Sequence, residues 1–107
     1  MRAAATTHRF GNVVNLERTT KEVLEWTTTH ETGHHLHFSA TFGVNEVIEA
    51  AYKDPERDYV GEYGASNHEE YFAESYCAYH HLGPEWREKR PRATAMVEAV
   101  MRMRGLL

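Results

Sequence analysis

The length, composition and charge of the chain place it among small soluble proteins. Its 107 residues, 41% hydrophobic and 26% charged, suffice for one domain with a modest core. The net charge of −4 gives no basic footprint for nucleic acid or an acidic membrane surface, and a single cysteine, Cys77, excludes internal disulfides and thiolate-cluster zinc sites. The sequence contains neither an apolar run of the roughly 18 residues that span a bilayer nor the apolar core of a signal peptide at its start.

The N-terminal part of the chain predicts little sheet and one long helix. We expect a single domain over residues 1–107, with residues 1–8 loose. Residues 9–16, RFGNVVNL, could form one short strand, so one or two strands at most precede the first helix. Thr19 and Glu22 have the spacing of a capping box, which predicts a helix over residues 20–37.

The remainder of the chain predicts three further helices. Residues 44–52 favour a short helix, and residues 53–67 read as a loop rich in Asp, Pro and Gly. A third helix should begin at Ser66 or Asn67 and run to about His81, where Leu-Gly-Pro would stop it. A fourth, amphipathic helix is expected within residues 92–103. The predicted fold class is mainly α, or α+β with a minimal sheet, with about four helices.

The first predicted helix carries the pattern His-Glu-x-x-His at His30, Glu31 and His34. Residues four apart lie on one face of a helix, so both histidines can direct a ring nitrogen at a single ion. Glu31 sits beside that face, where it can take a proton from a water that the ion activates. The pattern therefore indicates a metal site with an adjacent base.

A third ligand has to come from elsewhere in the chain. His37 lies seven residues from His30, about 10.5 Å along a helix, which is too far to share one ion. Glu70 and Glu74 on the third helix are four apart, so one could ligate while the other orients a ligand histidine. Spacing does not decide between them. Asn67 shares their face and is a further candidate for the surroundings of the ligands.

Two short motifs resemble the gluzincin zinc peptidases, in particular the catalytic domain of anthrax toxin lethal factor and its relatives. They are HETGH, residues 30–34, and YGASNHEEYFAES, residues 63–75. The second matches a family pattern in which Tyr-Gly leads into a helix reading Asn-x-x-Glu-aromatic-Phe-Ala-Glu. The resemblance implies a zincin-like fold, Zn²⁺ as cofactor and hydrolysis of peptide bonds in a protein or peptide substrate.

Carried over residue by residue, the resemblance assigns each motif position a role. It implies His30, His34 and Glu70 as zinc ligands and Glu31 as general base. Tyr63 would stabilise the oxyanion of the tetrahedral intermediate, and Glu74 would lie near the ligand histidines. Peptidases of this clan have a multi-stranded sheet before the first motif helix, for which the roughly twenty residues here are few. Further polypeptide could supply the missing sheet.

Two other interpretations of the same residues stay open. The chain could be a degenerate domain that keeps zinc for structure, or an interaction module within a larger protein or assembly. It could also be a metal-free helical protein with incidental histidines. His68, His80 and His81 are expected at surface or helix-end positions without a functional role, and Cys77 as a small buried hydrophobe.

Overall fold

A computed structural model describes residues 20–39 and 43–107, and helices dominate these residues. Five helices follow one another along the chain: α2 (Thr20–Phe38), α3 (Val44–Lys53), α4 (His68–His81), α5 (Gly83–Lys89) and α6 (Pro91–Met103). The described ranges contain no β-strand. The mainly α class predicted from the sequence is confirmed at this level.

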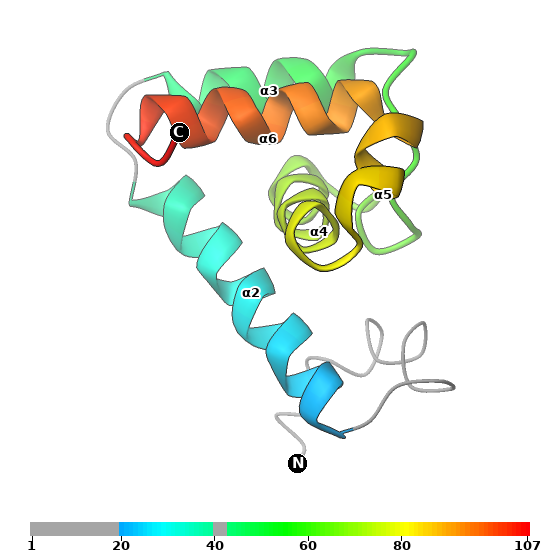
Figure 1. Cartoon of the computed structure of the whole chain (residues 1–107). Helices are drawn as coiled ribbons and strands as arrows, with labels where there is room; N and C mark the ends of the chain where they lie inside the picture. The colour runs from blue at the N-terminus through cyan, green and yellow to red at the C-terminus, as the bar shows by residue number, and fades with distance from the viewer. Residues whose placement is uncertain (1–19, 40–42) are drawn as a thin grey trace.

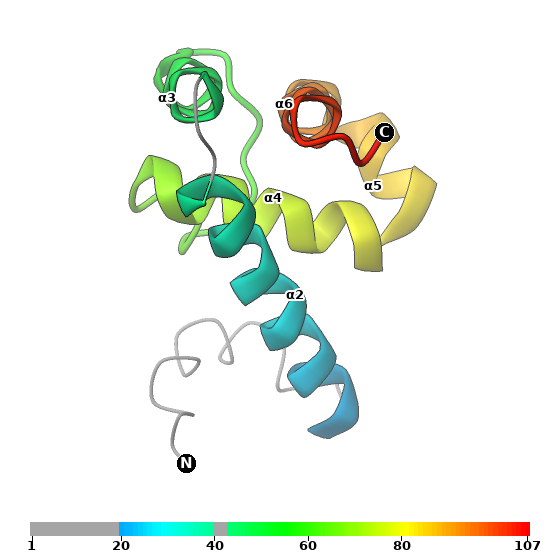
Figure 2. The ribbon, with the colours of Figure 1, turned by 90° about the vertical axis from the view of Figure 1, so that its left-hand side faces the viewer.

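Helix α4 lies at the centre of the molecule. Helices α3 and α6 run side by side across one face of α4, and α2 crosses its opposite face (Figures 1 and 2). All residues from 71 to 79 are buried, including Glu74 and Ser75. A helix that is covered on several sides has to be largely apolar around its whole circumference. Cys77 is buried there as expected, and burial raises the pKa of its thiol far above the usual value.

Helices α2 and α4 approach each other closely at Gly33. A Cβ atom at this position would lie 3.1 Å from the Cα atom of Ala73 and 3.4 Å from Tyr76. Only a glycine lets the two backbones come this near without displacing one of them. Gly33, one of the two residues between Glu31 and His34 in the motif, therefore sets how closely α2 packs against α4.

The loop between α3 and α4 is tied to the start of α6. The carboxylate of Asp58 accepts hydrogen bonds from the backbone N–H groups of Arg92 (2.7 Å) and Ala93 (2.9 Å). This is an N-terminal cap supplied from outside the helix, and it satisfies donors that α6 leaves open. Arg92 in turn forms ion pairs with Asp54 and Glu56. The loop that carries Tyr63 is thus anchored before α4 begins.

The described residues differ from the prediction by one additional helix. We predicted about four helices, but the described residues contain a fifth, α5, because Gly83 adopts a positive φ of 76° and Pro84 is well suited to a first helical turn. Pro91 then separates α5 from α6, since the residue before a proline disfavours helix. The expected strand at residues 9–16 and the capping residue Thr19 lie outside the described residues. Among those described, no helix is long and apolar enough to cross a membrane.

Candidate metal centre

The two motif histidines project from α2 toward α4. His30 is 5% exposed and His34 is partly buried, and their rings meet edge to face with centroids 4.8 Å apart. Their spacing of four residues places them one turn apart on the buried side of the helix. The predicted helical context of the motif is therefore present.

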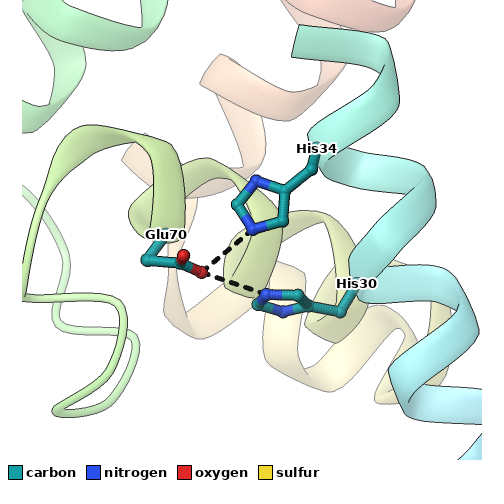
Figure 3. A group of neighbouring side chains, drawn as sticks. All are labelled: His30, His34 and Glu70. Carbon is teal, nitrogen blue, oxygen red and sulfur yellow. Dashed lines mark hydrogen bonds and ion pairs between the residues drawn. The ribbon is translucent and has the colours of Figure 1, made fainter. Parts of the chain in front are cut away.

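Glu70, near the start of α4, meets both rings with a single carboxylate oxygen. Its Oε1 atom lies 3.0 Å from Nε2 of His30 and 3.1 Å from Nε2 of His34, as Figure 3 shows. One ligand atom from each of the three residues falls within 4.8 Å of the others. The group comes from two helices, with His34 and Glu70 separated by 36 residues along the chain, and it could hold a metal ion.

Glu74 occupies the opposite side of His30. Its Oε2 atom lies 2.7 Å from Nδ1 of His30, and its side chain is buried. A carboxylate on Nδ1 fixes the ring orientation and directs Nε2 to the metal position. Spacing alone left Glu70 and Glu74 equivalent, whereas the fold puts one at the converging Nε2 atoms and the other behind the ring.

The two carboxylates change the protonation of the group when no metal is bound. Burial by itself lowers the pKa of His30, but the hydrogen bonds with Glu70 and Glu74 outweigh it and raise that pKa to about 9. Burial likewise raises the pKa of Glu70, but the hydrogen bonds with His30 and His34 lower it to about 2. The metal-free group is therefore an imidazolium held between carboxylates. A metal ion has to displace the proton on Nε2 of His30.

His34 is held in a different way, which the sequence analysis missed. Its Nδ1 atom is buried and has no hydrogen-bond partner among the described residues. Its ring instead stacks on Phe38, with centroids 5.4 Å apart and an interplanar angle of 2°. The signal was present in the sequence, because an aromatic residue four positions after a histidine lies on the same helix face.

Of the two residues predicted to act in catalysis, Tyr63 contacts the group, and Glu31 follows His30 directly along α2. The Tyr63 ring stacks on His30 with centroids 5.7 Å apart and an interplanar angle of 20°. Gly64, which follows it, is buried, and a Cβ atom there would collide with Val60 and touch Glu74. Glu31 has an exposed side chain on α2, one residue from His30. Tyr63 thus reaches the group from the loop, while Glu31 stands where solvent can reach it.

Asn67 acts on the group through the backbone. Its Oδ1 atom accepts a hydrogen bond of 2.9 Å from the backbone N–H of Glu70, which makes Asn67 the N-cap of α4. The cap determines where the helix begins and so where Glu70 emerges. The place predicted for Asn67 near the ligands is thus that of a helix cap, in contact with the backbone of Glu70.

The chemistry of these donors fits a divalent transition-metal ion. Two imidazole nitrogens and one carboxylate oxygen are ligands that zinc accepts, and three protein ligands leave a position for water or substrate. No protein family, no curated protein and no solved structure matches the chain. The resemblance to gluzincins therefore rests on the two motifs alone, and the zincin-like fold stays a prediction.

Proposed function

We propose that the chain is a zinc-dependent metallopeptidase domain of the gluzincin type, which hydrolyses peptide bonds in a protein or peptide substrate. The convergence of both motif histidines on Glu70 Oε1 carries the proposal, because it supplies the third ligand that the motif lacks. The zincin-like architecture belongs to the same proposal. So does the expectation that a substrate-aligning sheet comes from further polypeptide.

The residues of the chain divide the work around the metal. His30, His34 and Glu70 would hold Zn²⁺, which when bound lowers the pKa of a water molecule to near 7 and polarises a carbonyl. Glu31 would accept the proton of that water and pass it to the departing amine. Its exposed position on α2 is compatible with both transfers. Glu74 would keep the Nδ1 proton of His30 in place, so that Nε2 faces the metal.

Tyr63 would donate its phenolic hydroxyl to the oxyanion that develops on the substrate carbonyl. The stacking of its ring on His30 keeps the side chain beside the proposed metal ligands. The close packing at Gly64 fixes the backbone that follows it. Tyr63→Phe should lower kcat by about 100-fold or more with little change in KM, because the lost hydrogen bond forms only in the transition state.

Metal content and peptide cleavage together test the proposal. Zinc in the purified chain would be measured by mass spectrometry, with Glu70→Ala beside it and Glu69→Gln as a matched control on the same helix. Cleavage of quenched fluorescent peptides would then be compared in wild type and Glu31→Gln. We expect one tightly held zinc in the wild type and in Glu69→Gln, and the loss of this zinc in Glu70→Ala. The wild type should cleave the peptides, whereas Glu31→Gln should keep its zinc but no longer cleave them. A wild type that holds no zinc after handling without chelator would refute the metallopeptidase.

A structural zinc module is the second candidate, favoured by one observation. The described residues contain no strand, and so no sheet edge along which an extended substrate could align. A structural site would hold zinc in wild type and in Glu31→Gln alike, and neither would cleave peptides. Removing zinc would then lower the melting temperature without changing any activity.

A further inference from the structure

A second group of metal-ligating side chains lies one helical turn beyond the first, where α2, α3 and α4 meet. Nε2 of His37, on α2, is 2.7 Å from Oδ1 of Asn45, on α3. Nε2 of His68, the first residue of α4, is 3.1 Å from the same oxygen atom. Two imidazole nitrogens thus converge on one side-chain oxygen, as they do at Glu70.

The surroundings combine one fixed donor with two that can adjust. His37 is 5% exposed, and its ring packs against Phe38 and Phe72. Asn45 is exposed, and the side chain of His68 is 24% exposed. A buried anchor with adjustable partners lets the ligand atoms close around an ion without repacking the core. Phe38 also stacks on His34, so one ring contacts a histidine of each group.

A carboxylate stands at the edge of this second group. Oε2 of Glu49 lies 3.9 Å from Nε2 of His68, and its side chain is 40% exposed. It adds negative charge next to the converging atoms and can become a fourth ligand by a side-chain rotation. Two imidazoles with oxygen donors select a transition-metal ion over Ca²⁺ or Mg²⁺.

We propose that His37, Asn45 and His68 form a second, weaker site for a divalent transition-metal ion such as Zn²⁺ or Co²⁺, with Glu49 as an auxiliary ligand. It is weaker than the first because an amide oxygen carries no charge where Glu70 carries a full one. The hydrogen bonds now seen give way on binding, since each Nε2 has to lose its proton to become a ligand. The inference is independent of peptidase activity.

Metal titration of the full chain tests the second site. The chain would be stripped with a chelator, freed of it, and titrated with Zn²⁺ by calorimetry and with Co²⁺ by absorption spectroscopy. We expect one tight and one weaker equivalent. His68→Ala should remove the weaker equivalent and leave the tight one, whereas His35→Ala, which removes an exposed histidine from α2, should leave both. Binding of a single equivalent by the wild type would overturn the proposal.

A gain of affinity provides a test that does not depend on removing a contact. Asn45→Asp keeps the size of the side chain and places a carboxylate where the two Nε2 atoms converge. It should tighten the weaker equivalent by at least about tenfold, with the tight one unchanged. If the affinity of the second equivalent is unchanged in both Asn45→Asp and His68→Ala, or if this equivalent is lost in His35→Ala, the metal binds adventitiously to surface histidines. Either result would overturn the proposed site. If His68→Ala fails to fold, Asn45→Asp decides.

Discussion

The two histidine groups on α2 have similar geometry and different charge. In each, a pair of Nε2 atoms meets one side-chain oxygen, at 3.0 and 3.1 Å for Glu70 and at 2.7 and 3.1 Å for Asn45. The first group has a carboxylate at the meeting point and a second one, Glu74, behind His30. The second has an amide, and Nδ1 of His37 has no partner in the described part of the chain.

This difference separates what geometry and charge each contribute to a metal site. Convergent imidazoles are produced twice by the packing of α2 against its neighbours. A carboxylate stands at the meeting point in the first group only, where Glu70 together with Glu74 raises the pKa of His30 to about 9. In the second group the carboxylate of Glu49 stands at the edge, 3.9 Å from Nε2 of His68. The first group is thus strongly basic, holding a proton when empty and favouring a cation. We expect the affinities for metal to follow the charge at the meeting oxygen.

Glu70→Gln should reduce the difference in metal affinity between the two groups most strongly. The variant gives the first group the amide that the second has, and it keeps the shape of the side chain. We expect zinc affinity at the tight site to fall by more than about 100-fold, beyond the range found for outer partners of metal ligands. Competition with a chromophoric chelator would measure it. Glu69→Gln is the control, and an equal fall there would show that charge on α4 in general is responsible.

Glu74→Gln addresses the carboxylate behind His30. The amide can still accept from Nδ1 but carries no charge, so the ring keeps its orientation and loses basicity. Zinc affinity should fall by about 10-fold to 100-fold, less than for Glu70→Gln. The ¹⁵N shifts of the His30 ring, followed against pH in the metal-free chain, should show a lowered pKa. An unchanged affinity would mean that Glu74 serves packing alone.

The stability of the metal-free chain should depend on pH through the first group. The pKa of His30 is raised from 6.5 to about 9, so its stabilising contribution is complete below pH 6.5 and lost as pH rises through about 9. The pKa of Glu70 is lowered from 4.5 to about 2, so its contribution is present above pH 4.5 and lost as pH falls toward 2.

Urea unfolding of the metal-free chain between about pH 2 and pH 9 would measure the contributions of His30 and Glu70 to the free energy of unfolding. Stability should decline between pH 6.5 and 9 in wild type, and His30→Gln should flatten that decline. Zinc affinity should rise by up to about tenfold per pH unit below pH 9, since binding displaces one proton from His30. A zinc affinity that does not change with pH would contradict the imidazolium between carboxylates.

Gly33→Ala tests the spacing on which both groups depend. The added methyl meets the Cα atom of Ala73 at 3.1 Å, so α2 has to move away from α4. We expect about 1–3 kcal/mol of lost stability. Both sites should weaken, because each takes its ligands from α2 and α4: His30, His34 and Glu70 at the first, and His37 and His68 at the second. Thr32→Ala, at the exposed neighbouring position, is the control and should be close to neutral.

Much of the local structure followed from the sequence. The motif helix predicted over residues 20–37 is α2, Thr20–Phe38, and the third predicted helix is α4, His68–His81, with Asn67 as its N-cap. The same helical period placed His30 and His34 on one face. These features depend on interactions within a few residues, so spacing and capping residues suffice to predict them.

The choice of partners depended on the tertiary structure. Spacing left Glu70 and Glu74 equivalent, and it offered no reason to bring His37 and His68 to Asn45. Which of these side chains meet is set by how α2 crosses α4, and that crossing depends on Gly33 facing Ala73. The sequence by itself determined helices α2, α3, α4 and α6 and the residues on their faces, but not α5. Only their packing decided which carboxylate reaches the two histidines, because a contact between separate helices depends on their relative position and not on either period.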